Sequence, residues 1–375
     1  MRPTWAEVDL DAVQHNVQQL RRLAQGAELM AVVKANGYGH GAVRVGQAAL
    51  EAGATWLGVA TLEEGVELRQ NGIKAPILIL GFVPTSQADT VVLYNLTPAL
   101  FHRELAEALS HWGRTMGRTV PVHIKVDTGM GRVGLQPADL PAFAQAVAAL
   151  PNIEIEGVFT HLATADEPDS PFAQQQLDRF DAALAALKAA GIVPRIRHAS
   201  NSAGIMLRPR GHYDLVRAGI ALYGLPPDPS IPWPLDLRPA LTWKSRVAMV
   251  KLVEPDLPIS YGCTYRTSRR ERIATLPVGY ADGYFRLLSG RGEVLIRGRR
   301  CPVVGRVCMD QTMVRLPEDL EVPVGEEVVL LGEQEGQSIS ASDIAGRIGT
   351  INYEVVCAIS KRVPRRYRKD GQWVK

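Results

Sequence analysis

The segment Leu29–Gly41 reads LMAVVKANGYGHG, an apolar run that leads through Lys34 into a turn with three glycines. Such a run, bounded by glycine, is typical of a buried strand, and we predict a strand from Leu29 to Lys34. Burial lowers the pKa of an amine, which suits Lys34 to act as a base or a Schiff-base nucleophile. The glycines let the backbone approach a ligand closely, and Tyr38 can donate a hydrogen bond to an anion such as phosphate. For this segment alone, a solvated strand-end lysine before an ordinary turn is an equal alternative.

Seven similar runs follow before about Gly224, and amphipathic, alanine-rich helices alternate with them. One such helix is expected over Ser170–Ala190, because Gly191 and then Pro194 stop it. Eight strands that alternate with helices indicate an α/β fold, a (β/α)8 TIM-like barrel rather than an open sheet. The seven further strands are expected at Trp56–Ala60, Ile77–Leu80, Leu96–Leu100, Val122–Asp127, Gly157–His161, Ile196–Ser200 and Asp214–Arg217.

A proline-rich stretch at residues 226–234 ends this pattern, and alternating apolar residues without comparable helices follow it. We therefore divide the chain into a barrel over residues 1–235 and a C-terminal mainly-β domain over residues 236–375. The first residues of the chain are available to pair with the β domain. Its strands are expected at Leu241–Val253, Arg272–Val278, Gly292–Arg297, Val303–Leu316 and Glu326–Leu331.

The composition is that of an ordinary globular protein: 375 residues, 46% apolar and 22% charged, with a net charge of +3. The N-terminus has no signal-peptide core and no stretch is long enough to span a bilayer, so we expect a cytoplasmic protein with no membrane partner. The basic run Lys361–Lys369 reads as a solvated tail strand, because no nucleic-acid recognition motif accompanies it. Four distant cysteines fit neither a disulfide framework nor a metal site.

Polar residues collect where the predicted barrel strands end, and in a barrel these ends form one site. The fifth strand leads from Lys125 into a glycine-flanked loop with Arg132, whose planar fork can hold a carboxylate in two parallel hydrogen bonds. His161 ends the sixth strand, where a histidine is more often structural than catalytic. Residues 198–204 then open a helix with small polar side chains, and the backbone amides of residues 217–220 can complete a phosphate cradle there.

Residues 129–134 form a literal G-x-G-x-x-G, the fingerprint of dinucleotide-binding folds. In those folds the glycines open a helix at once, whereas Pro137 and Pro141 delay the helix here. Glu154 also begins the next strand instead of ending it. A nicotinamide-dependent dehydrogenase is therefore set aside.

Four glycine-bearing motifs mark the β domain, and each alone would pass as a turn beside a packed aromatic: residues 258–262 (PISYG), 277–283 (PVGYADG), 305–310 (GRVCMD) and 350–354 (TINYE). Together with VKANGYGHG at residues 33–41, they closely resemble alanine racemase, a pyridoxal-phosphate enzyme built from a barrel and a β domain. The resemblance covers essentially the whole chain.

The resemblance implies that Lys34 binds pyridoxal 5'-phosphate covalently and that Arg217 bonds its pyridine nitrogen, with His161 in support. It also implies that Arg132 and Met309 contact the substrate carboxylate. Lys125 matches a lysine that is often carbamylated and orients that arginine. Further cofactor-binding positions are Tyr38, Asn201, Ser202, Gly219, Ile220 and Tyr353.

In the family, Tyr261 is the second catalytic base and reaches across from a partner subunit, as do Met309 and Asp310. A homodimer is therefore expected. Tyr280 resembles a tyrosine that narrows the entry corridor with Tyr353, and Cys308 is a supporting residue with a packed thiol as the default interpretation. The implied role is the supply of D-alanine for cell-wall peptidoglycan.

Racemisation removes a proton from one face of the α-carbon and returns one to the other face, so two opposed bases are required. Lys34 fits the base for D-alanine and Tyr261 the base for L-alanine. The unperturbed pKa of tyrosine is about 10, so nearby cations must favour its phenolate. The permanently charged Arg217 cannot readily give a proton to the pyridine nitrogen, which should suppress side reactions such as transamination.

Two other interpretations remain open. A pyridoxal-phosphate amino-acid decarboxylase of the same fold type typically sets an acidic residue against the pyridine nitrogen and a cysteine across the dimer interface, where this chain has Arg217 and Tyr261. A cofactor-binding protein of the superfamily lacks the β domain. A racemase of broader specificity that includes serine is also possible, because one hydroxyl is hard to exclude sterically.

Overall fold

The computed structural model describes residues 2–24 and 26–374, which form two compact units. The barrel unit comprises Ala12–Gly37 and Ala42–Arg238. The β unit comprises the chain up to Asp11, the short segment Tyr38–Gly41, and the chain from Pro239 onward. Within the described residues, no helix has the length and apolar content that crossing a membrane requires.

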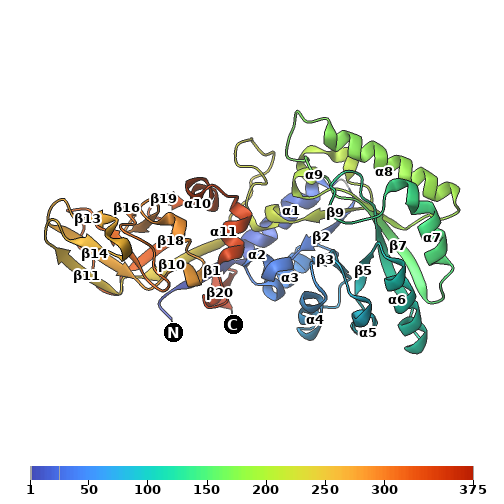
Figure 1. The fold of residues 1–375 in the computed structure, drawn as a ribbon, viewed down its shortest axis with the longest axis horizontal. Helices are drawn as coiled ribbons and strands as arrows, with labels where there is room; N and C mark the ends of the chain where they lie inside the picture. The colour runs from blue at the N-terminus through green and yellow to red at the C-terminus, as the bar shows by residue number, and fades with distance from the viewer. Residues whose placement is uncertain (1, 25, 375) are drawn as a thin grey trace. The chain divides into compact units, whose positions relative to one another are not determined.

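Eight parallel strands form the barrel unit, in the order β9-β2-β3-β4-β5-β6-β7-β8 (Figure 1). The sheet nearly closes, because the Arg217 amide donates to the Ser200 carbonyl across β8 and β9, at 3.1 Å. The predicted (β/α)8 barrel is therefore confirmed, with all eight strands at the expected places. Their bounds are β2 Glu28–Val32, β3 Trp56–Val59, β4 Ile77–Ile79, β5 Thr97–Leu100, β6 Val120–Lys125, β7 Ile153–Phe159, β8 Ile196–His198 and β9 Leu215–Ala218.

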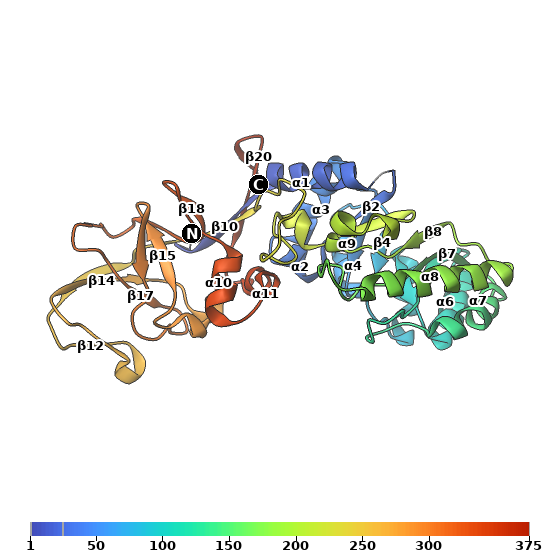
Figure 2. The same ribbon diagram turned by 90° about the horizontal axis from the view of Figure 1, so that it is seen from above.

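Helices surround these strands, as Figures 1 and 2 show. The longest, α8, begins two residues after the predicted Ser170 and ends one residue before the predicted Ala190, where Gly191 takes a left-handed φ of 82°. Its buried residues recur every three or four positions, including Leu177, Phe180 and Leu187, and join the apolar core beneath β6 and β7. The helices are α1 Leu10–Leu23, α2 Lys34–Tyr38, α3 Ala42–Glu51, α4 Leu62–Gln70, α5 Ala88–Leu93, α6 Arg103–Thr115, α7 Leu140–Ala148, α8 Phe172–Ala189 and α9 Ser202–Leu207.

The β unit contains one large sheet, with the strand order β16-β15-β18-β10-β1-β20-β21 and β19 paired to β18. A three-stranded sheet, β11-β14-β17, and the pair β12-β13 complete it. The strands are β1 Trp5–Asp9, β10 Leu241–Arg246, β11 Met249–Val253, β12 Pro258–Ile259, β13 Tyr265–Arg266, β14 Glu271–Leu276, β15 Glu293–Ile296, β16 Arg299–Pro302, β17 Thr312–Arg315, β18 Glu327–Gln334, β19 Gln337–Ile339, β20 Arg365–Lys369 and β21 Gln372–Val374.

The ends of the chain meet in this large sheet. The N-terminal strand β1 pairs antiparallel with β10 and parallel with β20, which lies inside the basic run of the C-terminal end. That run is a strand as predicted, but it is paired on both sides and half-buried rather than a solvated tail.

Three predictions for the β unit are wrong. The expected strand Leu241–Val253 is two strands in different sheets, because the chain leaves one sheet after Arg246 and enters the other at Met249. The expected strand Val303–Leu316 is mostly a loop, because Gly305 takes a left-handed φ of 69° that interrupts pairing. Two helices, α10 Ala341–Ile348 and α11 Asn352–Ala358, were not expected.

Gly157 on β7 leaves room for a buried side chain of β6. A larger residue at this position is therefore expected to lower the stability of the barrel unit. A methyl group at this position would lie 2.6 Å from His123 Nδ1. We expect Gly157→Ala to destabilise the barrel unit by about 1–3 kcal/mol. The measurement is the midpoint of thermal unfolding, which should fall by about 2–4 °C for each kcal/mol.

Gly346→Ala in α10 is the matched control, because no atom lies within 4 Å of the added methyl group. Alanine favours helix over glycine by about 1 kcal/mol, so its midpoint should be unchanged or higher. An equal loss in both variants would contradict the proposed collision with His123.

Candidate active site

Lys34 does not end its strand as predicted. Strand β2 ends at Val32, and Lys34 begins α2, in which Ala35, Asn36 and Gly37 take left-handed φ values of 53°, 52° and 61°. A left-handed backbone cannot continue sheet pairing, so the strand stops before the lysine. The Lys34 side chain is half-buried.

Arg217 on β9 is buried, with 3% of its surface exposed, and acceptors hold its guanidinium. Its Nη1 donates to Nδ1 of His198 at 2.9 Å, while Nη2 donates to the carbonyls of Thr160 and Ala199 at 2.9 and 2.8 Å. Nη2 also lies 3.1 Å from Nδ1 of His161. Burial and the nearby Arg132 lower the pKa of Arg217 to about 9, which leaves it charged at neutral pH.

His161 lies two residues beyond the end of β7 and is surrounded by cations. Burial lowers its pKa well below the ordinary value, and the charges of Arg217, Lys125, Arg132 and Lys34 lower it further. These four residues come from the ends of β2, β6 and β9 and from the loop after β6. The structure therefore brings the predicted barrel-end residues together around a neutral imidazole.

The Lys125 side chain at the end of β6 is buried, with 4% of the residue's surface exposed. Burial, Arg217 and Arg132 lower the pKa of its amine well below the usual range, and Asp127 opposes this. Its Nζ lies 4.8 Å from the centre of the Phe159 ring and makes no hydrogen bond within the described residues. A buried amine of this kind calls for an additional acceptor.

A chain of buried side chains leads away from Arg217. Because a guanidinium only donates, His198 Nδ1 must accept, so His198 Nε2 carries the proton and donates to His123 Nδ1 at 2.8 Å. His123 Nε2 then faces Glu156 Oε2 at 3.4 Å. The sequence analysis assigned no role to His123; its position two residues before Lys125 on one strand, hence on the same face, is the signal that points to it.

Residues that were predicted to hold a phosphate lie together where α9 begins. Ser202 Oγ accepts hydrogen bonds from the amides of Gly219 and Ala221, at 2.9 and 3.3 Å. Asn201 caps the helix by accepting from the Gly204 amide at 3.0 Å. Ile220 is buried beside them. Two backbone amides from the segment after β9 thus converge on the hydroxyl oxygen of Ser202.

The G-x-G-x-x-G stretch is a loop and opens no helix. Asp127 accepts hydrogen bonds from the amides of Gly129 and Gly131, and Gly129, Gly131 and Gly134 all have positive φ. The same loop carries Arg132, whose side chain is exposed. The glycines therefore shape the loop that carries Arg132.

In the β unit, Tyr38 and Tyr353 lie together, with ring centres 6.3 Å apart. Tyr38 is buried, and burial and the proximity of Tyr353 and Cys357 raise the pKa of its hydroxyl. The close approach of Gly39 to the Val356 carbonyl, where any side chain would collide, fixes this arrangement.

The other predicted residues of the β unit gather where three loops meet. Tyr261, Tyr280 and Met309 are 72%, 42% and 52% exposed, which is unusual for large apolar side chains. The Tyr280 amide donates to the Cys308 carbonyl at 3.0 Å, and Cys308 Sγ lies 3.5 Å from Ser260 Oγ, next to Tyr261.

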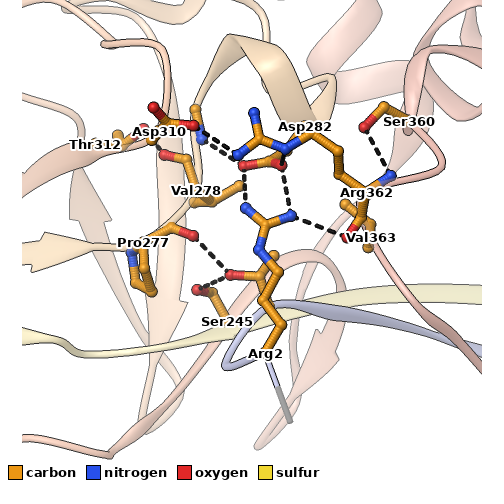
Figure 3. Close-up of polar contacts among 12 residues, drawn as sticks. Arg2, Ser245, Pro277, Val278, Asp282, Asp310, Thr312, Ser360, Arg362 and Val363 are labelled. Atoms are coloured by element: carbon orange, nitrogen blue, oxygen red, sulfur yellow. Dashed lines mark hydrogen bonds and ion pairs between the residues drawn. The ribbon is translucent and has the colours of Figure 1, made fainter.

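Figure 3 shows the ion pairs that hold these loops. The fully buried Asp282, in the turn that carries Tyr280, pairs with Arg2 at 2.6 Å and with Arg362 at 3.5 Å. Arg362 also donates to Asp310 at 2.7 Å. Two guanidinium groups thus stabilise a buried carboxylate and orient the predicted Asp310.

Comparison with known proteins gives the family. Residues 8–227 match the model for the alanine racemase N-terminal domain, and residues 240–367 match the one for the C-terminal domain. The chain belongs to the alanine racemase family. An alanine racemase from Symbiobacterium thermophilum is 63% identical over 98% of this chain and 97% of that protein.

Solved structures agree over the whole chain. The alanine racemase from Bacillus anthracis with bound L-Ala-P superimposes with a TM-score of 0.95 and 43% identity, over 100% of this chain and 97% of that one. The alanine racemase from Clostridium difficile in complex with cycloserine has a TM-score of 0.93 and 40% identity, over 100% and 98%. The predicted family and reaction class, an isomerase acting on alanine, are confirmed.

Three histidines of the barrel unit predict acid sensitivity. Burial lowers the pKa of His123, His161 and His198 below the value near 6.5 that they have when unfolded. The unfolded chain therefore binds protons that the folded chain does not, and stability falls as pH drops below about 6.5. The slope should reach roughly 1.4 kcal/mol per pH unit for each histidine, measured by urea unfolding of the barrel unit.

His161→Gln should reduce this slope by up to one third. His111→Gln is the control, because His111 lies on α6 with its side chain exposed. An identical pH dependence in the wild type and His161→Gln would show that His161 is not held neutral.

Proposed function

We propose that this chain interconverts L-alanine and D-alanine with pyridoxal 5'-phosphate as cofactor, and with Lys34 and Tyr261 as the two bases. One observation carries the proposal: the basic side chains of Lys34, Arg132 and Arg217 gather with Lys125 around neutral His161. Such a site suits two anions at once, the phosphate of the cofactor and the carboxylate of the substrate.

The barrel residues fit this cofactor. Lys34 supplies the amine that would bind it covalently, and Arg217 would donate to the pyridine nitrogen. Ser202, Gly219 and Ile220 would hold the phosphate, where amides already converge on the Ser202 hydroxyl. Asn201, Tyr38 and Tyr353 stay predictions for cofactor binding. When bound, pyridoxal phosphate stabilises negative charge at the substrate α-carbon.

The protein's own groups would move the proton. For D-alanine, the Lys34 amine would take the α-proton from one face and the Tyr261 hydroxyl would deliver a proton to the opposite face. For L-alanine, the two groups would exchange these roles. Arg132 would hold the substrate carboxylate through two parallel hydrogen bonds, assisted by Met309. Because the carboxylate and the α-carbon of the substrate would then be held in place, both bases could reach the same α-carbon.

Lys125 is proposed to carry a carbamate. Its amine is buried and its pKa is lowered, so the neutral and nucleophilic form is favoured. Addition of the neutral amine to carbon dioxide, with loss of one proton, would give a carbamate whose negative charge would lie close to Arg132. The modified side chain would then orient that arginine for the substrate.

The supply of D-alanine for peptidoglycan in the cytoplasm remains the expected biological role. Within the described residues the four cysteines form no disulfide, and the Cys308 sulfur contacts the Ser260 hydroxyl and the Arg306 carbonyl. Serine stays a possible slow substrate, because the addition of one hydroxyl is discriminated weakly.

The exposed residues of the β unit support a homodimer. Tyr261, Tyr280 and Met309 form an exposed aromatic and methionine surface around Cys308, and such residues are enriched in interfaces between subunits. We propose that a partner subunit covers this surface, so that Tyr261, Met309 and Asp310 serve the partner's barrel. The active site would then be complete only in the dimer.

Turnover tests the proposed bases. The wild-type chain with pyridoxal phosphate should convert L-alanine to D-alanine, followed by chiral chromatography. Tyr261→Phe should lower kcat by roughly 100- to 10,000-fold, because it removes one of two required bases. In D2O this variant should still exchange the α-proton of D-alanine through Lys34, but not that of L-alanine.

Tyr265→Phe is the control, because Tyr265 donates to Glu271 in the same region and takes no part in the proposal. Release of carbon dioxide would indicate a decarboxylase. Bound cofactor without turnover would indicate a binding protein, and equal loss of both exchange reactions in Tyr261→Phe would remove its assignment as one of two bases.

The oligomeric state tests the shared site. The wild type should be a dimer by light scattering, and Met309→Glu should weaken it, because a charge would be buried in the interface. Its specific activity should fall steeply on dilution. Val324→Glu is the matched control, since Val324 is 67% exposed in the β unit and lies outside the surface around Tyr261. A fully active monomer would refute the dimer proposal.

A further inference from the structure

The backbone that follows Lys34 is strained. Ala35, Asn36 and Gly37 take left-handed φ values in succession, and Tyr38 continues with a φ of 49°. This conformation is unfavourable for a residue with a Cβ atom, and only one of the four is glycine. The surrounding structure must therefore hold the turn in place.

One carboxylate makes a short hydrogen bond to this turn. Glu64 Oε1 accepts from the Ala35 amide at 2.6 Å, while its Oε2 accepts from the amides of Ala60 and Thr61 at 2.7 and 3.3 Å. Ala60 directly follows β3, and Glu64 lies in the first turn of α4. A single side chain thus ties the residue after Lys34 to the end of the neighbouring barrel strand.

Two further bonds hold the far side of the turn. The Gly37 amide donates to the Val33 carbonyl at 2.8 Å, and Asn36 Oδ1 accepts from the Ala42 amide at 3.2 Å. Neither of them contacts Ala35. Glu64 is therefore the group that fixes the backbone immediately next to the lysine.

We propose that Glu64 is a positioning residue for Lys34: it holds the strained turn so that the amine stays aimed at the cofactor site of the barrel. The inference rests on the proposed role of Lys34 and extends it to a residue that does not touch substrate or cofactor. The carboxylate acts through the backbone and carries out no chemical step.

The simpler interpretation is that Glu64 only caps α4. Thr61 and Glu64 do form a capping box, in which the Thr61 side chain accepts from the Glu64 amide at 3.4 Å. That motif uses Oε2 alone. It does not account for Oε1, which makes the shorter bond to Ala35 in a different segment of the chain. The two roles can therefore be separated by mutation.

Hydrogen exchange in the cofactor-free chain provides the first test. In Glu64→Gln, the amide side chain keeps one acceptor oxygen and turns its NH2 group toward a backbone donor. Loss of a hydrogen bond to a charged group should speed exchange of the Ala35 amide by roughly 10- to 100-fold. Thr61→Ala removes the cap but keeps the bond to Ala35, so exchange there should not change.

Glu63→Gln is the second control, because it makes the same change of charge one residue away, where the carboxylate contacts Gln87 instead. Capture of pyridoxal phosphate by the cofactor-free chain is the second measurement. Capture by Glu64→Gln should be roughly 10- to 100-fold weaker, and kcat should fall with little change in KM for alanine. Both controls should behave as the wild type.

Equal effects in Glu64→Gln and Thr61→Ala would reduce Glu64 to a helix cap and overturn the proposal. Unchanged exchange and capture in Glu64→Gln would also overturn it. If that variant does not fold, Glu64→Asp decides: its shorter carboxylate cannot reach both strand ends, so the same changes are expected in smaller measure. A wild type that captures the cofactor but does not racemise alanine would refute the proposed function, while the exchange and capture data would still judge Glu64.

Discussion

Positive charge held in the mouth of an apolar barrel is the constraint on which the site depends. Lys34, Lys125, Arg132 and Arg217 all act on His161, and burial of Lys125 and Arg217 keeps water from screening those two fully. Burial, and then the repulsion between like charges, lowers the pKa of Lys125, Arg217 and His161. A bound anion stabilises such a cluster of cations, and the proposed phosphate and carboxylate ligands would supply that charge.

The barrel could be predicted from the sequence because its strands are buried on both faces. Such strands read as continuous apolar runs, and glycine and proline mark where the helices between them end. The barrel-end residues could be predicted as well, because Lys125 and Arg217 lie near the ends of the predicted strands. The contact between Arg217 and His198 did not follow, because the strand order predicts that β8 and β9 are neighbours but not which of their side-chain atoms meet.

The β unit was harder because its signals are short and local. The helix α10 has a readable start, a capping box between Ser340 and Asp343, but α11 begins without a side-chain cap and contains the β-branched pair Val355 and Val356, which favours a strand. The loop that contains Met309 was predicted to be a strand for the same reason, its content of β-branched residues. The role of Glu64 was missed because its carboxylate joins segments 29 residues apart. The sequence pattern indicates the capping box with Thr61 but not the hydrogen bond to the Ala35 amide.

Backbone carbonyls of the barrel favour an arginine at position 217 on β9. The carbonyls of Thr160 and Ala199 both point at Nη2 of Arg217, and His198 presents an unprotonated nitrogen to Nη1. A carboxylate in this place would face acceptors only, with no donor to stabilise its charge. An acidic partner for the pyridine nitrogen, as in the decarboxylases of this fold type, would therefore require both strand ends and the tautomer of His198 to be rebuilt. The buried hydrogen bonds from Arg217 through His198 to His123 thus disfavour a decarboxylase-type site. This argument does not depend on the residues that would contact the substrate.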